Sequence, residues 1–294
     1  MDELFSYALR LGLYLALMLL FGRMLFIRPV LATRWYRALI LVSLTLVVAD
    51  AVTRLSGLLG LPPNSIDTGT VLWFATETPV GLASITRIAA LLALLLLCIA
   101  EPPISRMRRA AGILLSAAAL ASLAWNGHAA AGDGLTGDLR LGAGMVHLLA
   151  AGAWVGAIAS FLQLAVRGSG SSLRHRTYEL WNATHRFAWP GTVIVVLLAM
   201  TGVYNYVDLG GSQSSLFGTN HGRWLLLKLG IVSVMLLLAA LHRWRLVPAL
   251  AAAIRTGGQL RALRFLRFSL TGDAVLAFLV LVCVAVLGTL DPLT

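Results

Sequence analysis

The chain has 294 residues, of which 59% are hydrophobic and 12% are charged, and its formal net charge is +11. A mean hydropathy of +0.86 is too high for a soluble domain, because a soluble core of this size needs far less apolar surface. The composition therefore excludes an ordinary soluble protein and indicates one that spans a membrane.

Eight apolar stretches are long enough to cross a bilayer, which takes about 20 residues per helix. Because backbone groups in lipid must pair internally, each stretch is predicted to be a helix. The stretches cover residues 4–27, 37–60, 81–100, 108–127, 141–164, 187–208, 223–243 and 267–290. The predicted fold is all-α: a polytopic integral membrane helix bundle, with residues 1–294 forming a single domain.

The connections between these stretches alternate in charge, which indicates how the chain is threaded through the membrane. Arginines surround the odd-numbered connections: Arg23, Arg28, Arg34 and Arg37; Arg106, Arg108 and Arg109; Arg167, Arg174, Arg176 and Arg186; Arg243, Arg245, Arg255, Arg261, Arg264 and Arg267. The even-numbered connections carry Asp67, Glu77, Asp133, Asp138 and Asp208. We expect the basic connections to be cytoplasmic, so both termini are predicted to be periplasmic. The basic excess is thus a topology signal and does not indicate nucleic-acid binding.

Three connections are longer than the others. We expect 57–80 to be an outer loop and 165–186 to be an inner loop made flexible by Gly168-Ser169-Gly170-Ser171-Ser172. The inner connection 244–266 is predicted to lie on the membrane surface as a basic amphipathic helix. Cys98 and Cys283 are isolated in apolar stretches, which indicates a lipid-facing position or core packing and excludes a disulfide framework and a CxxC metal site.

Two histidines flank the fourth connection. His128 ends one apolar stretch and His147 lies one to two turns into the next, so both should face the outer aqueous side at matching depth. Neutral imidazole is a good ligand for copper, zinc, iron or nickel. We therefore predict a metal site at His128 and His147, with Met145 and His221 as weaker candidate ligands. The alternative is a pair of interfacial histidines that are hydrogen-bonded to loop carbonyls.

Ionisable residues at membrane depth are costly and therefore informative. Arg87, Lys228 and Asp273 lie within apolar stretches, and Asp50 stands four residues before Arg54. In a structural interpretation Asp50 pairs with Arg54 or Arg87, and Lys228 extends outward to water. In a functional interpretation these side chains line a polar path for an ion. His185 and His242 lie at the cytoplasmic ends of their helices, where an exit site is an alternative to a purely structural role.

Six short motifs are spread along the chain in a fixed order. They are Gly127-His128-Ala129, His147 with Trp154-Val155-Gly156, Thr201-Gly202-Val203-Tyr204-Asn205, Gly222-Arg223-Trp224, Arg243-Trp244-Arg245-Leu246-Val247-Pro248 and Leu290-Asp291-Pro292. In their order and spacing these motifs resemble the bacterial copper resistance protein D (CopD) family. The resemblance is densest over residues 183–294, where the chain departs from the family pattern at His221, His242 and Asp273, at which Tyr, Asn and Glu are expected.

The resemblance implies a multi-pass protein of the bacterial inner membrane that moves copper from periplasm to cytoplasm, with a periplasmic carrier of the CopC type as a partner. Copper is then captured at the histidine pair; a Met ligand would favour Cu(I), and His with oxygen ligands Cu(II). No phosphate-binding loop is visible, so we expect passive or ion-coupled transport and no enzymatic activity. The side chains expected to shape or gate the path are Arg87, Trp154, Asn205, Lys228 and Asp273.

Two other functions fit parts of the pattern. A haem-binding membrane electron carrier would use histidines on facing helices as axial ligands. A non-transporting partner in copper or oxidase assembly would use them only structurally. Bound iron would favour the first, and independence from metal would favour the second.

Overall fold

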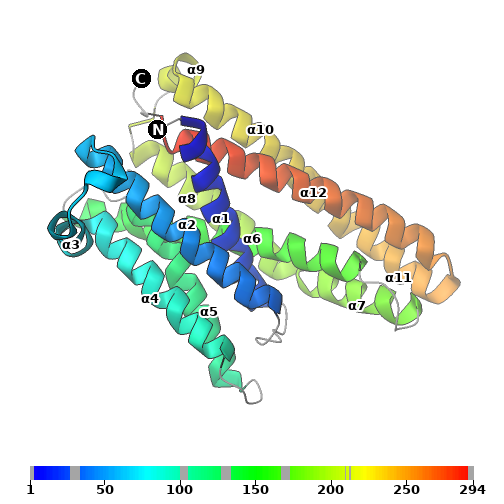
Figure 1. Cartoon of the computed structure of the whole chain (residues 1–294). Helices are drawn as coiled ribbons and strands as arrows, with labels where there is room; N and C mark the ends of the chain where they lie inside the picture. The colour runs from blue at the N-terminus through cyan, green and yellow to red at the C-terminus, as the bar shows by residue number, and fades with distance from the viewer. Residues whose placement is uncertain are drawn as a thin grey trace. The chain divides into compact units, whose positions relative to one another are not determined.

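The fold is described by a computed structural model that covers residues 3–26, 34–99, 105–126, 134–166, 173–208, 210–211 and 213–290. Within these residues every regular element is a helix (Figure 1). Eight spans are long and apolar enough to cross a membrane. They are α1 (Glu3–Phe26), α2 (Arg34–Leu59), α4 (Pro79–Ile99), α5 (Arg106–Ala121) with η2 (Ser122–Asn126), α6 (Gly134–Val166), α8 (Ala188–Asp208), α10 (Asn220–Leu241) with the helical segments after it, and α12 (Gln259–Leu287). The predicted all-α fold with eight candidate spans is confirmed.

Shorter helices occupy several of the connections between the spans. They are η1 (Pro63–Ser65), α3 (Thr68–Glu77), α7 (Leu173–Arg186), α9 (Gln213–Gly218), the π-helical η4 (His242–Leu246) and α11 (Val247–Thr256). The expectation of a loop over 165–186 is wrong for its larger part, because α7 packs against α11 and α12 and buries Thr177 and Leu180. Residues 168–172, expected to be flexible, lie outside the described residues. The basic surface helix expected over 244–266 is divided: α11 covers only part of it, and α12 already begins at Gln259.

The described part of the chain divides into two compact units. Unit 1 comprises Met1–Ala153 and Leu197–Ser212, and unit 2 comprises Trp154–Val196 and Gln213–Thr294. In unit 1, α1 packs against α2 and α5, and α4 packs against α2, α3 and α5. The core of this unit includes the fully buried side chains of Leu13, Leu17, Leu91 and Leu94. The expectation that residues 1–294 form one domain stays a prediction.

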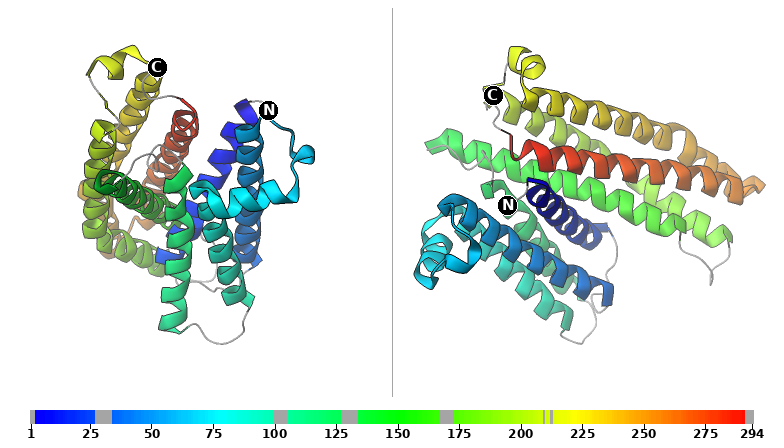
Figure 2. Two further views of the ribbon diagram at one scale, coloured as in Figure 1. Left: turned by 90° about the vertical axis from the view of Figure 1, so that its left-hand side faces the viewer. Right: turned by 45° about the horizontal axis from the view of Figure 1, so that its top comes forward.

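In unit 2, α10 and α12 lie side by side along most of their length (Figures 1 and 2). Ile158, Met235 and Ala277 form a buried cluster there. Each unit also holds one free cysteine, Cys98 in unit 1 and Cys283 in unit 2, and both thiols are buried. Of the two positions predicted for these cysteines, lipid-facing or packed in the core, the structure shows the second.

Arginines bind the carbonyl ends of two helices in unit 1. Arg37 Nη2 donates to Cys98 O at 3.2 Å, and Arg109 Nη2 donates to Leu25 O at 3.1 Å. The last carbonyls of a helix lack partners within it, and cations are favoured at that end. The first and third connections, which follow α1 and α4, therefore lie at the same end of unit 1. This arrangement agrees with the charge alternation read from the sequence.

Side-chain caps determine where two of these helices begin. Asp67 accepts a hydrogen bond from Thr70 N at 3.0 Å, and Thr219 accepts one from Gly222 N at 2.9 Å. Such caps satisfy amides that have no partner in the first turn. Hydrogen bonds from Thr70 Oγ1 and N also hold the pKa of the Asp67 carboxyl below its usual value.

A close backbone approach makes Gly222 necessary at the start of α10. A Cβ added there would lie 2.3 Å from the carbonyl oxygens of Ser215 and Leu216, whereas one added to Gly230 in the same helix would meet nothing within 4 Å. We expect Gly222→Ala to destabilise the protein by about 1–3 kcal/mol through overpacking. Gly230→Ala, the matched control, should stabilise it by about 0.5–1 kcal/mol. Thermal unfolding in detergent, followed by tryptophan fluorescence, measures both; equal effects would contradict the steric explanation.

Candidate functional site

The predicted ligand His147 lies on α6, partly buried, and contacts α8 within unit 1. Its Nδ1 is 2.8 Å from Thr201 Oγ1. The Thr201 hydroxyl donates its own proton to Leu197 O at 2.5 Å, so its oxygen acts as the acceptor for an Nδ1–H of the imidazole. This contact agrees with the Nδ1-protonated tautomer of histidine, in which Nε2 is the nitrogen that binds a metal. The predicted alternative, bonds from the two histidines to loop carbonyls, stays a prediction, because residues 127–133 lie outside the described residues.

An ion pair fixes the register of α6 against α8. Arg140 Nε bonds Asp208 Oδ2, and these residues lie seven positions from His147 and Thr201 on their respective helices. The two helices therefore run antiparallel, with two polar contacts about two turns apart. Asn205 lies between them, one turn after Thr201, and its buried Oδ1 has no hydrogen-bond partner among the described residues.

The second predicted ligand, His128, lies outside the described residues, as do its neighbours 127–133. Among the residues that the structure describes, no three His, Cys, Asp or Glu side chains are grouped so that they could hold a metal ion. Met145 lies on α6 two residues before His147 and is partly buried. His221 lies in the first turn of α10, in unit 2.

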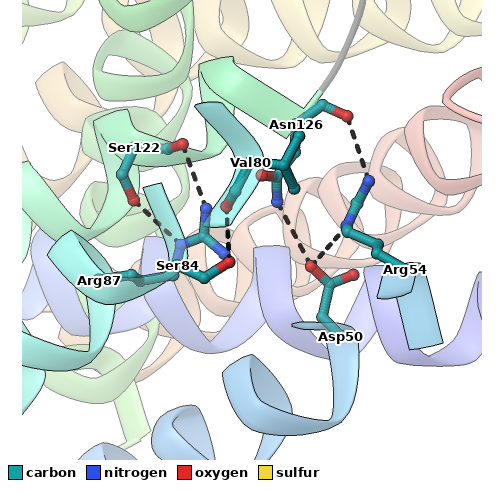
Figure 3. A network of polar contacts seen from close by, with 7 residues as sticks. All are labelled: Asp50, Arg54, Val80, Ser84, Arg87, Ser122 and Asn126. Carbon is teal, nitrogen blue, oxygen red and sulfur yellow. Dashed lines mark hydrogen bonds and ion pairs between the residues drawn. The ribbon is translucent and has the colours of Figure 1, made fainter. Parts of the chain in front are cut away.

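The chain segment that leads to His128 is anchored by a buried polar cluster in unit 1 (Figure 3). Asp50, only 3% exposed, accepts from Arg54 Nε at 2.8 Å and from Asn126 Nδ2 at 3.3 Å through the same oxygen, Oδ2. Arg54 Nη1 also donates to Asn126 O at 3.3 Å. The cluster thus ties the end of η2 to α2, and the predicted pairing of Asp50 with Arg54 is confirmed.

Arg87 bonds a partner that the sequence pattern does not indicate. Its side chain is fully buried on α4, and it donates from Nε to Ser122 Oγ at 3.0 Å and from Nη2 to Ser122 O at 3.1 Å (Figure 3). Its Nη1 has no hydrogen-bond partner among the described residues. Asp50 lies close enough to interact with the guanidinium electrostatically. Arg87 therefore joins α4 to η2 and places a fixed positive charge within the helices of unit 1.

Three predicted path residues belong to unit 2. Lys228 on α10 is partly exposed and lies close enough to the buried Cys283 thiol on α12 to interact with it electrostatically. Trp154 packs beside Ile158, Met235 and Ala277, and its buried Nε1 has no acceptor among the described residues. Asp273 on α12 is 3% exposed, and its Oδ1 likewise has no partner there.

Comparison with known proteins identifies the family. Residues 1–138 match the family described as copper resistance protein D-like, N-terminal domain, and residues 181–287 match copper resistance protein D. Copper resistance protein D of Pseudomonas syringae pv. tomato is 31% identical over 313 aligned residues, which cover 99% of this chain and 98% of the relative. The chain belongs to the copper resistance protein D family.

Two further relatives extend the comparison. Inner membrane protein YebZ of Escherichia coli (strain K12) is 27% identical and matches 97% of each chain. Copper transport protein CutJ of Bacillus subtilis (strain 168) is 34% identical over 125 residues, which are 42% of this chain and 22% of the relative. No solved structure matches the chain. As a copper resistance protein D family member, the chain is a multi-pass membrane protein with a copper-related function, and the family resemblance read from its motifs is confirmed.

Thr201 is a residue of the candidate site that the spacing of residues in the sequence did not predict. It lies in the segment Thr201 to Asn205, which was singled out from the sequence as a motif and not as a partner of His147. Ser122 carried no such signal, because a serine near the end of an apolar stretch is common.

Proposed function

We propose that this protein carries copper ions across the bacterial inner membrane, from periplasm to cytoplasm. The observation that carries the proposal is the nearly full-length likeness to a copper resistance protein D. It is supported by the eight candidate spans and by two relatives named as an inner membrane protein and a copper transport protein. On this proposal the protein moves a cargo and is not an enzyme.

Copper is captured at the periplasmic end, by His128 and His147. The hydrogen bond from His147 Nδ1 to Thr201 supports this role, because it orients the imidazole with Nε2 as the coordinating atom. Met145, which lies on the same helix as His147, is an additional ligand, and both termini are periplasmic. A periplasmic copper carrier of the CopC type delivers the ion to this pair.

Polar side chains then shape the path inward. Asn205 offers an amide oxygen, one turn from Thr201, that has no partner among the described residues. The carboxylate of Asp273 attracts the ion at a later point of the path. The positive charges of Arg87 and Lys228 repel a copper cation and so confine it to a route away from them. The indole ring of Trp154 lines this route. The ligand that completes the histidine pair sets the oxidation state of the copper: Met145 favours Cu(I), and oxygen donors favour Cu(II).

The test is the metal content of the purified protein, measured by elemental mass spectrometry. We expect about one copper per chain in the wild type, since one histidine pair defines one site, and loss of that copper in His128→Ala/His147→Ala. His175→Ala is the matched control, because His175 is an exposed histidine that bonds Glu179 on its own helix. Iron in place of copper, or copper retained by the double variant, would overturn the proposed capture site.

A further inference from the structure

Unit 2 contains a cavity of about 760 Å³, lined by α6, α7, α8, α10, η4, α11 and α12. Its walls are mainly apolar and aromatic, with Trp154, Phe161, Trp181 and Trp244 among them. Asp273 of α12 lines the same cavity. A mainly apolar cavity with few polar groups is typical of a binding site, and its polar groups indicate what it binds.

Asp273 differs sharply from the other buried aspartate of the chain. Asp50 and Asp273 are each 3% exposed, but Asp50 is ion-paired with Arg54. Asp273 makes no ion pair or hydrogen bond with the described residues, and its Oδ1 is buried without a donor. An ionised carboxylate in a low-dielectric site needs a cation or several donors, whereas a protonated carboxyl does not. The surroundings of Asp273 therefore favour a bound proton when no other cation is present.

The charged groups around the cavity already have other partners. α7 contributes His185, which stacks on Trp181 with ring centroids 5.3 Å apart. η4 contributes Arg243, which donates from Nη1 to Thr192 Oγ1 at 2.9 Å, and His242. The cavity-lining residues of α6, α8, α10 and α11 include no titratable side chain. No permanent positive charge is therefore directed at Asp273 by the elements that line the cavity.

The polar groups that follow Asp273 along α12 in the direction of η4 are Ser269 and, bonded to it, His242. His242 Nε2 is 2.8 Å from Ser269 Oγ, and Ser269 lies one helical turn before Asp273, on the same face of α12. Trp154 Nε1 is a second buried polar atom on the cavity wall without a partner among the described residues. The cavity is large enough for water, which can satisfy both the orphan donor and the orphan acceptor and can carry protons.

We propose that Asp273 is a proton-binding site that exchanges its proton with water through Ser269 and His242, and that this proton is the coupling ion of copper transport. On release, the O–H bond of the carboxyl breaks, and the proton passes to cavity water or to the unprotonated nitrogen of His242, leaving a carboxylate. The carboxylate then attracts the copper cation. The coupling rests on the proposed function, whereas the proton site does not.

Infrared spectroscopy of the purified protein tests the proton site without copper. We expect a protonated-carboxyl C=O band near neutral pH that is lost in Asp273→Asn and kept, shifted, in Asp273→Glu. Asp50→Asn is the matched control and should leave the band unchanged, because Asp50 is ion-paired with Arg54 whereas Asp273 has no such partner among the described residues. Deuterium exchange of the band should be about a hundredfold slower in Ser269→Ala, the lower end of what a positioned acid–base group contributes. Absence of a band that depends on Asp273 overturns the proton site, and unchanged exchange overturns the route.

Proteoliposomes loaded with a pH-sensitive dye test the coupling. Copper entry should be accompanied by proton movement in the wild type, and proton movement should be lost in Asp273→Asn. Wild-type copper entry without proton movement would overturn the coupling and leave the proposed function intact. No wild-type copper entry would overturn the proposed function, while the infrared result would still decide the proton site.

Discussion

Replacing Thr201 by valine is expected to weaken copper binding about 10–100-fold, because the loss of a partner that orients a ligating histidine has effects of this size. Valine keeps the shape of threonine but cannot accept the hydrogen bond from His147 Nδ1. The imidazole then loses both its fixed orientation and the bond that selects its tautomer. Competition with a soluble copper chelator in detergent micelles measures the change in affinity.

The design includes two matched variants. Thr201→Ser retains the hydroxyl and should bind copper as the wild type does. Thr86→Val removes a hydroxyl in unit 1 that bonds only Leu82 O on its own helix, so it should have no effect on affinity. If Thr201→Val bound copper as tightly as Thr86→Val, the orienting role of Thr201 would be wrong, whatever the effect on stability.

Replacing Asp50 by alanine should destabilise the protein by about 3 kcal/mol, because removing one partner of a buried ion pair leaves the other charge without compensation. Asp50 is the carboxylate with which Arg10, Arg54 and Arg87 interact electrostatically. The Arg54 side chain is 21% exposed, so water compensates part of the loss and the effect should lie at the low end of the usual range. Denaturant unfolding of the purified protein measures it.

Asp138→Ala is the control for the change in net charge. Asp138 is exposed on α6, and a surface substitution of this kind should change stability by less than about 0.5 kcal/mol. Equal stabilities of the Asp50→Ala and Asp138→Ala proteins would mean that the polar cluster around Asp50 contributes nothing measurable. The double variant Asp50→Ala/Arg54→Ala should recover part of the loss, since it removes one of the uncompensated charges.

The spanning helices could be predicted because lipid imposes a length and a composition on each of them. The same criterion missed α7, since its many charged and polar residues give it too little apolar surface to span lipid. It is helical because Leu180 packs beside Leu250 and Leu266 in a buried cluster. α3 was missed because ten residues are too few to span. Hydropathy thus identifies segments that face lipid, while short helices that pack against protein need tertiary information.

The candidate site was predictable only in part. Sequence spacing placed His147 near the end of a spanning helix, but spacing within one helix carries no information about its register against another. The contact of His147 with Thr201 therefore required the structure, and so did the contact of Arg87 with Ser122. The Asp50–Arg54 pair was predictable because residues four apart face each other on one helix. Whether His128 joins His147 stays a prediction, as does the role of Asn205.

The two cysteines provide a consequence for experiments on folding. Cys98 is 1% exposed in unit 1 and Cys283 is 2% exposed in unit 2, so neither thiol can be alkylated until its own surroundings open. A membrane-permeant maleimide, with Cys98→Ala and Cys283→Ala used to assign the signals, then times the opening of each half separately. The two native cysteines thus report on the two units separately. A difference between the alkylation rates of Cys98 and Cys283 would show which unit opens first.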